Sequence, residues 1–212
     1  MNVERIVTGK WTENCYVVYD DSDSALVIDP GGDAAEIARF VDTERLVVKA
    51  VLNTHAHYDH VGAVADLKER WSAPFYLHSQ DLRLLRSANF YHTLFGGAGE
   101  IKVPAVDRFV DHGEQPLRID PFTVHVLATP GHTAGGVCYL VEDHLFTGDT
   151  LLQGGIGRVD LPGGHLETLL DSLRLLAALP GPTKVLPGHG ATTTMADELR
   201  HNPALRQAAS LP

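Results

Sequence analysis

The feature that most constrains this chain is a dense cluster of histidines with one aspartate in its first third. The segment Thr-His-Ala-His-Tyr-Asp-His (54–60) directly follows a nearly unbroken apolar run with β-branched residues, which predicts a buried strand. In an extended segment, side chains two residues apart point to the same side, so His55 and His57 can converge on one cation. Where the chain then turns into a helix, Asp59 and His60 can face a second cation. The sequence therefore requires a fold in which a strand ends at a metal site.

Three further turns each offer one more candidate ligand. They are Pro-Gly-His-Thr with His132, Thr-Gly-Asp-Thr with Asp149 and Pro-Gly-His-Gly with His189, and each follows a predicted strand. A glycine precedes every candidate, and its lack of a side chain lets the backbone approach a crowded centre. A lone histidine is usually a satisfied core or surface residue. Four separate strand-end turns that each supply a ligand type do not fit that interpretation.

The candidate side chains are numerous enough for two metal ions per chain. Three histidines and a shared carboxylate would make one site, and an aspartate, two histidines and the same carboxylate would make the other. Nitrogen and oxygen ligands at low coordination number favour zinc, with iron or manganese as possible substitutes. We therefore expect two divalent metal ions, with Zn²⁺ as the first choice.

This series of motifs resembles the metallo-β-lactamase superfamily and its HxHxDH motif, and the resemblance covers most of the chain. It implies an α/β fold, a four-layer αβ/βα sandwich with the metals at one edge between the sheets. It also implies one domain over residues 1–212. The resemblance assigns the ligands as His55, His57 and His132 for the first metal, Asp59, His60 and His189 for the second, and Asp149 as the bridge.

Two segments narrow the resemblance to one group within the superfamily. Residues 148–160 and the stretch Pro-Gly-His-Gly-Ala-Thr-Thr-Thr (187–194) resemble the glyoxalase II-like (hydroxyacylglutathione hydrolase-like) group, specifically its short bacterial type. Full-length glyoxalase II enzymes continue into a helical C-terminal domain that binds glutathione, and we expect this chain to be without it. The commonest zinc β-lactamases have a cysteine at the position of Asp149, which disfavours antibiotic hydrolysis. The resemblance implies hydrolysis of a thioester, either hydroxyacyl-glutathione or another acyl-thiol.

The same resemblance implies roles for individual side chains. A metal-bridging hydroxide would attack the thioester carbonyl, with Asp59 and Asp149 as catalytic ligands, and the thiolate would leave without a strong general acid. Arg158, on a glycine-rich loop, either binds a carboxylate or amide of the thiol portion or forms a salt bridge to Asp160 or Asp149. Four further polar residues are expected to orient the ligands by hydrogen bonds without touching the metals: Asp29, Thr54, Thr133 and Thr150.

Two other functions remain open for a chain with these motifs. One is a persulfide dioxygenase of the same fold, which uses a single iron and also keeps an arginine in a similar loop. The Pro-Gly-His-Gly turn at residues 187–190 resembles the hydrolases more than these dioxygenases. The other is a non-catalytic metal-binding protein, against which the complete set of ligands argues.

Composition limits the partners and the location. The formal net charge of −10 argues against nucleic acid or an anionic membrane, which leaves a small-molecule acyl-thiol as the expected partner. No apolar run approaches the length of a membrane span, and the first ten residues lack a secretory core. Cys15 and Cys138 lie in apolar, strand-like surroundings and are expected to be buried free thiols. These features together favour the cytoplasm. The sequence does not fix the oligomeric state.

Periodicity and turn residues predict the main elements. Asp33 is expected to cap a helix, with Glu36 completing a capping box. Residues 89–104, which contain three glycines and no clear period, are expected to form a long surface loop. The predicted strands are residues 15–19, 25–29, 47–53, 74–77, 122–128, 136–141, 145–146 and 184–186, and the predicted helices are residues 33–41, 61–71, 80–87, 165–179 and 196–201.

Overall fold

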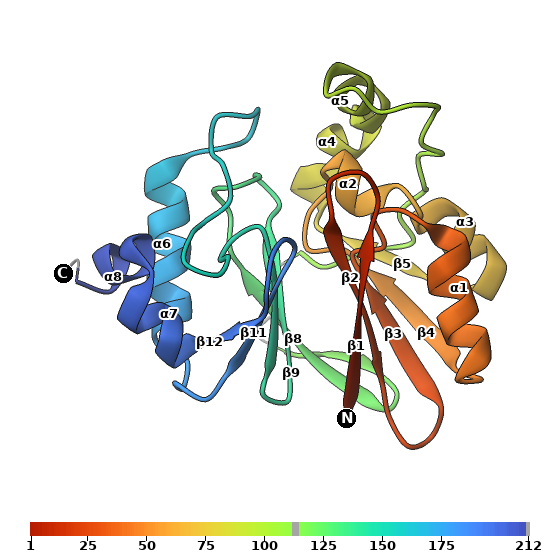
Figure 1. Cartoon of the computed structure of the whole chain (residues 1–212), viewed down its shortest axis with the longest axis horizontal. Helices are drawn as coiled ribbons and strands as arrows, with labels where there is room; N and C mark the ends of the chain where they lie inside the picture. Colours follow the sequence, from red (N-terminus) through yellow and green to blue (C-terminus); the bar gives the residue numbers. More distant parts are fainter. Residues whose placement is uncertain (112–114, 211–212) are drawn as a thin grey trace. The chain divides into compact units, whose positions relative to one another are not determined.

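The computed structural model of the chain describes residues 1–111 and 115–210, which form two compact units. The first unit contains residues 1–111 with the short segment 119–121, and the second contains residues 122–210 with 115–118. The described residues form two six-stranded sheets, one centred in each unit (Figure 1). Strands and helices thus occur in two successive sets, as the α/β prediction requires.

The sheet of the first unit combines an antiparallel half with a parallel half. Its strand order is β1-β2-β3-β4-β5-β6. The strands are β1 (Asn2–Thr8), β2 (Glu13–Tyr19), β3 (Ser24–Ile28), β4 (Val47–Leu52), β5 (Phe75–Leu77) and β6 (Arg108–Phe109). The strands predicted at residues 15–19 and 25–29 are β2 and β3, which pair antiparallel. The two edge strands of this sheet, β1 and β6, were not predicted. Because β3 and β4 run parallel, their carboxyl ends meet at one edge of the sheet.

Helices cover this sheet and close its core. They are α1 (Ala34–Thr43), α2 (Tyr58–Val61), α3 (Val64–Trp71), the 3₁₀ helix η1 (Ser79–Asp81), α4 (Leu82–Arg86) and α5 (Ala88–Leu94). Val17 and Val27 of the sheet pack in one cluster with Ile37 of α1 and Leu67 of α3, and all four are almost completely buried. Burial of these apolar side chains is the main contribution that fixes the helices on the sheet.

Three details of the first unit differ from the prediction. The capping box is wrong: Asp33 has a left-handed backbone (φ 47°) and its side chain makes no cap bond. Its Oδ2 instead accepts from the amide of Gly9 at 2.8 Å. The predicted helix 61–71 is interrupted around Gly62, where α2 ends and α3 begins. The predicted loop 89–104 is wrong for its first part, because α5 extends through Leu94.

The sheet of the second unit has the order β12-β11-β10-β9-β8-β7. Its strands are β7 (Leu117–Ile119), β8 (Phe122–Ala128), β9 (Val137–Val141), β10 (His144–Gly148), β11 (Lys184–Pro187) and β12 (Thr193–Thr194), and its helices are α6 (Leu166–Ala177), α7 (Met195–His201) and α8 (Pro203–Ser210). Leu173 of α6 and Leu205 of α8 pack in one buried cluster with Leu145 and Val185 of the sheet. The predicted strands and helices here are confirmed within a few residues, whereas β7, β12 and α8 were not predicted.

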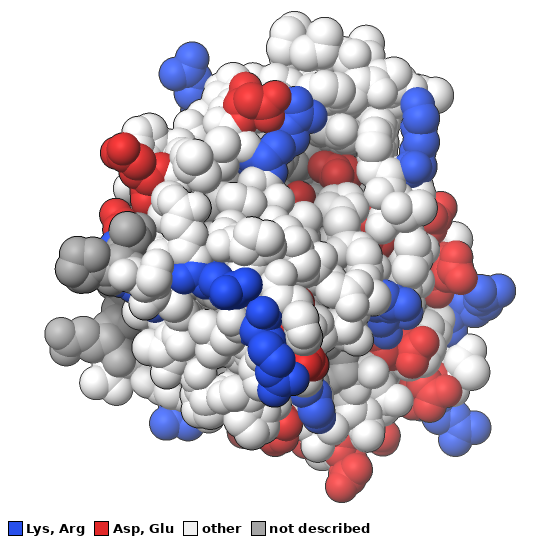
Figure 2. Space-filling model, turned by 60° about the vertical axis from the view of Figure 1, so that its left-hand side comes forward, with Lys and Arg blue, Asp and Glu red and all other residues white. Residues whose placement is uncertain are grey.

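The structure shows how charged side chains are distributed on one face, how apolar the helices are and where the two cysteines lie. On the face shown in Figure 2, lysines and arginines lie singly or in short runs among acidic and uncharged residues. In the part of the chain that the structure describes, no helix has the length and apolar character needed to cross a bilayer. Cys15 and Cys138 are free and buried, as predicted. Burial raises the pKa of the Cys15 thiol well above its ordinary value, which makes it unreactive.

Candidate metal centre

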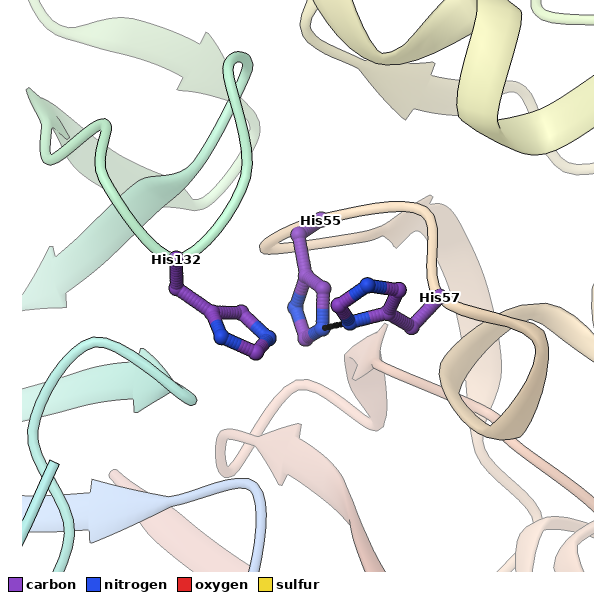
Figure 3. Close-up of side chains that lie close together, drawn as sticks. All are labelled: His55, His57 and His132. Atoms are coloured by element: carbon purple, nitrogen blue, oxygen red, sulfur yellow. Dashed lines mark hydrogen bonds between the residues drawn. The ribbon is translucent and has the colours of Figure 1, made fainter. Parts of the chain in front are cut away.

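Four of the predicted ligands lie together in the first unit, where β4 ends. The chain leaves β4 at Leu52 and enters α2 at Tyr58, with His57 extended (φ −65°, ψ 149°) at the residue before the helix. Figure 3 shows the rings of His55 and His57 turned toward each other, and their Nε2 and Nδ1 atoms are 3.0 Å apart. The ligand atoms of Asp59 and His60 lie within 4.8 Å of each other. The segment therefore brings the predicted ligands together in two adjacent pairs, and their role in metal binding stays a prediction.

Asp29 and Thr54 orient two of these imidazoles. Thr54 donates from its amide and its hydroxyl to the two oxygens of Asp29, at 2.7 and 2.6 Å. Because that hydroxyl directs its proton to Asp29, its oxygen can accept from Nδ1 of His55, 3.1 Å away. Nδ1 of His60 lies 3.2 Å from Asp29 Oδ2. With Nδ1 protonated, Nε2 of each ring keeps its lone pair for a metal, which is the usual effect of a carboxylate placed behind a metal-binding histidine.

Two buried carboxyl groups that the sequence did not single out support the same segment. Asp81, 1% exposed, accepts from the amide of Ala56 at 2.9 Å. Glu13, also 1% exposed, accepts from the hydroxyl of Thr8 and has its Oε1 3.8 Å from Nδ1 of His60. Desolvation by burial is the main cause that holds the pKa of Glu13 well above its usual range. An acidic residue at the start of an apolar strand was the available signal for Glu13, whereas Asp81 lies in the first turn of the predicted helix 80–87, where an acidic residue is common.

The remaining three predicted ligands lie together in the second unit. His132 follows β8, Asp149 directly follows β10 and His189 follows β11. Asp149 Oδ2 lies 3.6 Å from Nε2 of His132 and 3.7 Å from Nε2 of His189. A carboxylate oxygen that faces two imidazoles has the arrangement expected of a ligand shared between two metals. The role of Asp149 as a bridge stays a prediction.

The backbone around these ligands depends on glycine at the predicted positions. Gly131 and Gly148, which precede His132 and Asp149, have positive φ angles of 127° and 48°. A Cβ at Gly131 would lie 2.3 Å from the amide nitrogen of Leu169 in α6. Side chains larger than hydrogen are therefore strained at both turns. The amide of His165, just before α6, donates to the carbonyl of Gly131 at 2.8 Å, which holds the His132 turn against the helix.

Arg158 lies on the loop that follows Asp149 and is bound to its own neighbour. Its Nε and Nη2 atoms donate to the two oxygens of Asp160 at 2.7 and 2.8 Å. The bidentate contact lowers the pKa of Asp160 to about 2. The carbonyl of Arg158 accepts from Nδ1 of His132 at 2.7 Å. The loop thus orients a predicted ligand through its backbone, and the guanidinium forms one of the two salt bridges that the sequence predicted in place of substrate binding.

The C-terminal helices hold the other end of this loop. Glu198 of α7, 2% exposed, accepts from the amide of Gly154 at 2.8 Å. Asn202, completely buried, donates to the carbonyls of Leu152 and Gly155 at 3.3 and 2.9 Å. Asn202 also donates to Glu198 at 2.8 Å, so the two side chains form one network. We call this pair the C-terminal clamp. It fixes the turn that connects Asp149 to Arg158.

Both clusters have the donor atoms and spacing that a divalent metal needs. Two ligands bound to one tetrahedral zinc at about 2.0–2.1 Å are about 3.3–3.4 Å apart. The separation of 3.0 Å between the ring nitrogens of His55 and His57 is close to this value, and so are the distances of 3.6 and 3.7 Å around Asp149. Imidazole and carboxylate donors suit zinc, iron and manganese. The residues present therefore fit the metals that the sequence predicted.

Comparison with known proteins gives the family and two similar proteins. The family model of the metallo-beta-lactamase superfamily matches residues 8–189. The chain is 39% identical to "Probable metallo-hydrolase YqgX" of Bacillus subtilis (strain 168), over 97% of this chain and 98% of that protein. It is 35% identical to the hydroxyacylglutathione hydrolase GloC of Haemophilus influenzae, again over 97% of this chain and 98% of the relative.

Solved structures match the fold over nearly the whole chain. The B3 metallo-beta-lactamase BLEG-1 superposes with a TM-score of 0.91 and 38% identity, over 96% of this chain and 99% of that chain. TTHA1623, in a di-iron-bound form, superposes with a TM-score of 0.84 and 38% identity, over 94% of this chain and 98% of that chain. These matches confirm the predicted fold class and the resemblance on which it was based. The chain belongs to the metallo-β-lactamase superfamily.

Proposed function

We propose that this metal-dependent hydrolase binds two metal ions and cleaves a thioester of the acyl-glutathione type or another acyl-thiol. The observation that carries the proposal is the pair of ligand clusters, each with imidazole and carboxylate donors at the spacing of a metal shell. The superfamily consists mostly of metal-dependent hydrolases. The relative named as a hydroxyacylglutathione hydrolase spans the same length as this chain and supports the thioester as substrate.

The ligand assignment follows the superfamily pattern. We propose that His55, His57 and His132 hold the first metal, that Asp59, His60 and His189 hold the second, and that Asp149 bridges them. Zinc is the preferred metal because of the donor set, although the di-iron form of a similar structure keeps iron in consideration. When bound, two such cations make a water molecule acidic enough to give hydroxide near neutral pH and polarise a carbonyl oxygen.

The protein's own residues prepare this chemistry. Asp29 and Thr54 hold the rings of His55 and His60 so that Nε2 is unprotonated. Asp59 and Asp149 supply negative charge that balances the cations and orients the attacking water. The departing group is a thiolate, whose ordinary pKa of about 8.5 removes the need for a strong general acid. The proposed ligands therefore suffice for a thioester, whereas the poorer leaving group of an ester or amide would need an added proton donor.

Arg158 is the proposed contact for an anionic thiol portion. Its guanidinium is half exposed, with a side-chain exposure of 51%, and its present partner Asp160 is also at the surface. A substrate carboxylate could replace Asp160 because both present the same two oxygens to the guanidinium. Bracing of the loop by the Arg158–Asp160 pair is the competing role. Measurements on a variant of Arg158 distinguish them.

A β-lactamase is the second candidate, because a structure named as a B3 metallo-beta-lactamase matches this chain with a TM-score of 0.91. The sequence argued against a β-lactamase because the commonest zinc β-lactamases have a cysteine at the position of Asp149, and this structural likeness argues the other way. Two more candidates share this fold: an iron-dependent persulfide dioxygenase and a non-catalytic metal-binding protein. We expect no nucleic acid or membrane partner, and the two buried free thiols support a cytoplasmic location.

Metal analysis combined with a substrate panel tests the proposal. Purified protein loaded with zinc is expected to hold close to two metals per chain and to hydrolyse S-lactoylglutathione or another acyl-thiol. A chromogenic cephalosporin serves as the parallel substrate, and we expect it to be cleaved far more slowly. Cephalosporin cleavage with no thioester cleavage would favour the β-lactamase. One iron per chain, with oxygen consumed in the presence of a persulfide, would favour the dioxygenase.

A further inference from the structure

A cavity of about 380 Å³ adjoins Asp59 within the first unit. Its walls come from four segments of the chain: the end of β1 with the turn before β2, the loop after β3, α2 with Gly62, and α5 with the chain that follows it. Figure 1 shows the β1–β2 turn beside α2, at the end of the sheet that carries the ligand segment. Because Asp59 is both a lining residue and a proposed metal ligand, the cavity lies against the segment that carries the proposed ligands.

One side of the cavity is an aromatic wall. The rings of Trp11 and Tyr58 meet edge to face, with centroids 4.6 Å apart and planes at 75°. His92 of α5 lies 5.6 Å from Trp11, and Phe95 stacks on Tyr58 at 5.7 Å. Tyr58 is 9% exposed, so the wall has a buried support. We call Trp11, Tyr58 and His92 the aromatic wall. Such a surface binds flat or apolar groups well, because aromatic rings combine a large apolar area with preferred edge-to-face geometry.

Glycines leave the rest of the cavity empty of side chains. Six of its lining residues are glycines: Gly9, Gly31, Gly32, Gly62, Gly96 and Gly97. A Cβ at Gly31 would lie 1.7 Å from the carbonyl oxygen of Asp59, so the β3 loop and α2 approach too closely for any other residue there. Lys10 donates to the carbonyl of Gly96 at 2.9 Å, which ties the β1–β2 turn to the chain after α5. The cavity is therefore a fixed part of the first unit.

The charges around the cavity argue against an anionic occupant. The lining includes the carboxylate of Glu100, and also Asp59, whose charge the proposed metals would balance. The one lysine there, Lys10, already donates to a carbonyl and lies 5.6 Å from the ring centroid of Trp11. An uncharged group avoids both the repulsion from Glu100 and the cost of desolvating a charge. The wall and the charges together favour an apolar, neutral ligand.

We propose that this cavity is a subsite for the acyl group of the substrate, and that it selects uncharged acyl groups with an aromatic ring or a branched chain. The proposal rests on the thioesterase function proposed above. Cavities that enclose whole small ligands have volumes of about 300–1,000 Å³. A volume of about 380 Å³ is near the lower limit, so the cavity suits an acyl group rather than a whole thiol such as glutathione, which is larger and anionic.

Two variants and one control test the subsite on zinc-loaded protein. Trp11→Ala removes one of the three rings of the aromatic wall. Ala98→Phe fills the cavity from an exposed lining position, where a larger side chain does not disturb the core. Phe90→Ala is the control, because Phe90 is an aromatic residue of α5 that is 64% exposed and does not line the cavity.

The expected result is a change in acyl preference. With S-(phenylacetyl)glutathione, Trp11→Ala and Ala98→Phe should lower kcat/KM about three- to tenfold, the range that loss of one aromatic contact gives. With S-acetylglutathione, whose acyl group is too small to reach the wall, both variants and Phe90→Ala should stay close to the wild type. Equal losses for the two substrates would overturn the subsite. A wild-type preference for S-succinylglutathione over S-(phenylacetyl)glutathione would overturn the selection of uncharged groups.

A binding measurement separates the subsite from the proposed reaction. The chain has two tryptophans, so Trp71→Phe leaves Trp11 as the only indole. In that background, the neutral amide 2-phenylacetamide should change the fluorescence of Trp11 in a saturable way, and adding Ala98→Phe should abolish the change. Binding without thioester cleavage would leave the subsite standing and contradict the thioesterase function. Thioester cleavage without binding would do the reverse.

Discussion

Asp81 is a buried carboxylate outside every predicted ligand turn, and its replacement tests how the metal-binding segment is held in place. Its Oδ2 accepts from the amide of Ala56 at 2.9 Å, and Ala56 is the residue between His55 and His57. An aspartate at the residue before a helix normally caps that helix, but the side chain of Asp81 makes no cap bond to α4. Its contact therefore serves the ligand segment.

The expected magnitude follows from the chemistry of that contact. A hydrogen bond to a charged group contributes about 1.5–3 kcal/mol, and Asp81→Ala also leaves the Ala56 amide buried without this acceptor. One kcal/mol corresponds to about 2–4 °C in the melting temperature of a chain of this size, so the metal-free variant should melt about 3–12 °C lower. Loss of an outer partner of metal ligands typically weakens metal affinity about 10- to 100-fold.

A second substitution separates the hydrogen bond from the charge. Asp81→Asn retains an oxygen that can accept from Ala56 and removes the negative charge. We expect it to restore much of the melting temperature while zinc affinity, measured by competition with a chelator, stays below that of the wild type. Asp66→Ala is the matched control, because the Asp66 side chain is 63% exposed and lies in the same unit. Wild-type zinc affinity in Asp81→Ala would refute the reasoning.

The remaining predictions concern three side chains near the two clusters. Asp149→Ala should lower the content of both metals and abolish hydrolysis, since a shared carboxylate compensates two cations; an active variant with full metal content by elemental analysis would contradict the bridge. Arg158→Ala should lower kcat/KM about 10- to 100-fold for anionic thioesters, mainly through KM, and spare neutral ones. Equal losses, together with a lower melting temperature, would show that the pair with Asp160 only braces the loop. For metal-free protein, burial holds the pKa of Glu13 well above its usual range, so the wild type loses stability as pH rises above the pKa of an unfolded glutamate. Glu13→Gln should therefore become more stable relative to the wild type, by up to about 1.4 kcal/mol per pH unit, as the pH rises above the ordinary glutamate pKa of about 4.3. A difference in unfolding free energy that does not change with pH would rule this out.

The ligand turns could be predicted because their signals are local. A buried strand that ends in a histidine-rich segment predicts where β4 delivers its side chains, and the pleat predicts that His55 and His57 face the same way. A glycine before His132 or Asp149 predicts a backbone that approaches its neighbours closely, and a Cβ at Gly131 would lie 2.3 Å from the amide nitrogen of Leu169. Each of these inferences depends on only a few neighbouring residues, so contacts with distant segments had little effect on the local conformation.

The residues that support the ligands could not be predicted because their partners are far away in the sequence. Asp81 contacts Ala56 and Glu13 approaches His60, and neither spacing corresponds to a local motif. The same competition made the capping box wrong. The carboxylate of Asp33 accepts from the amide of Gly9, in the β1–β2 turn, instead of from an amide of its own helix. The two residues are far apart in the sequence, so a local motif cannot predict this contact.

The C-terminal clamp shows that the helices after the last ligand belong to the candidate site. Asn202 ends α7, and its Oδ1 accepts from the amide of Leu205 at 3.2 Å, so one side chain both starts α8 and holds the turn that follows Asp149. Leu205 of α8 packs with Leu173 of α6, and α6 in turn fixes the His132 turn through His165. The geometry of the second cluster thus depends on packing among three helices that contain none of its ligands. A pattern of ligand motifs carries no information about such packing, which is why α8 was not predicted.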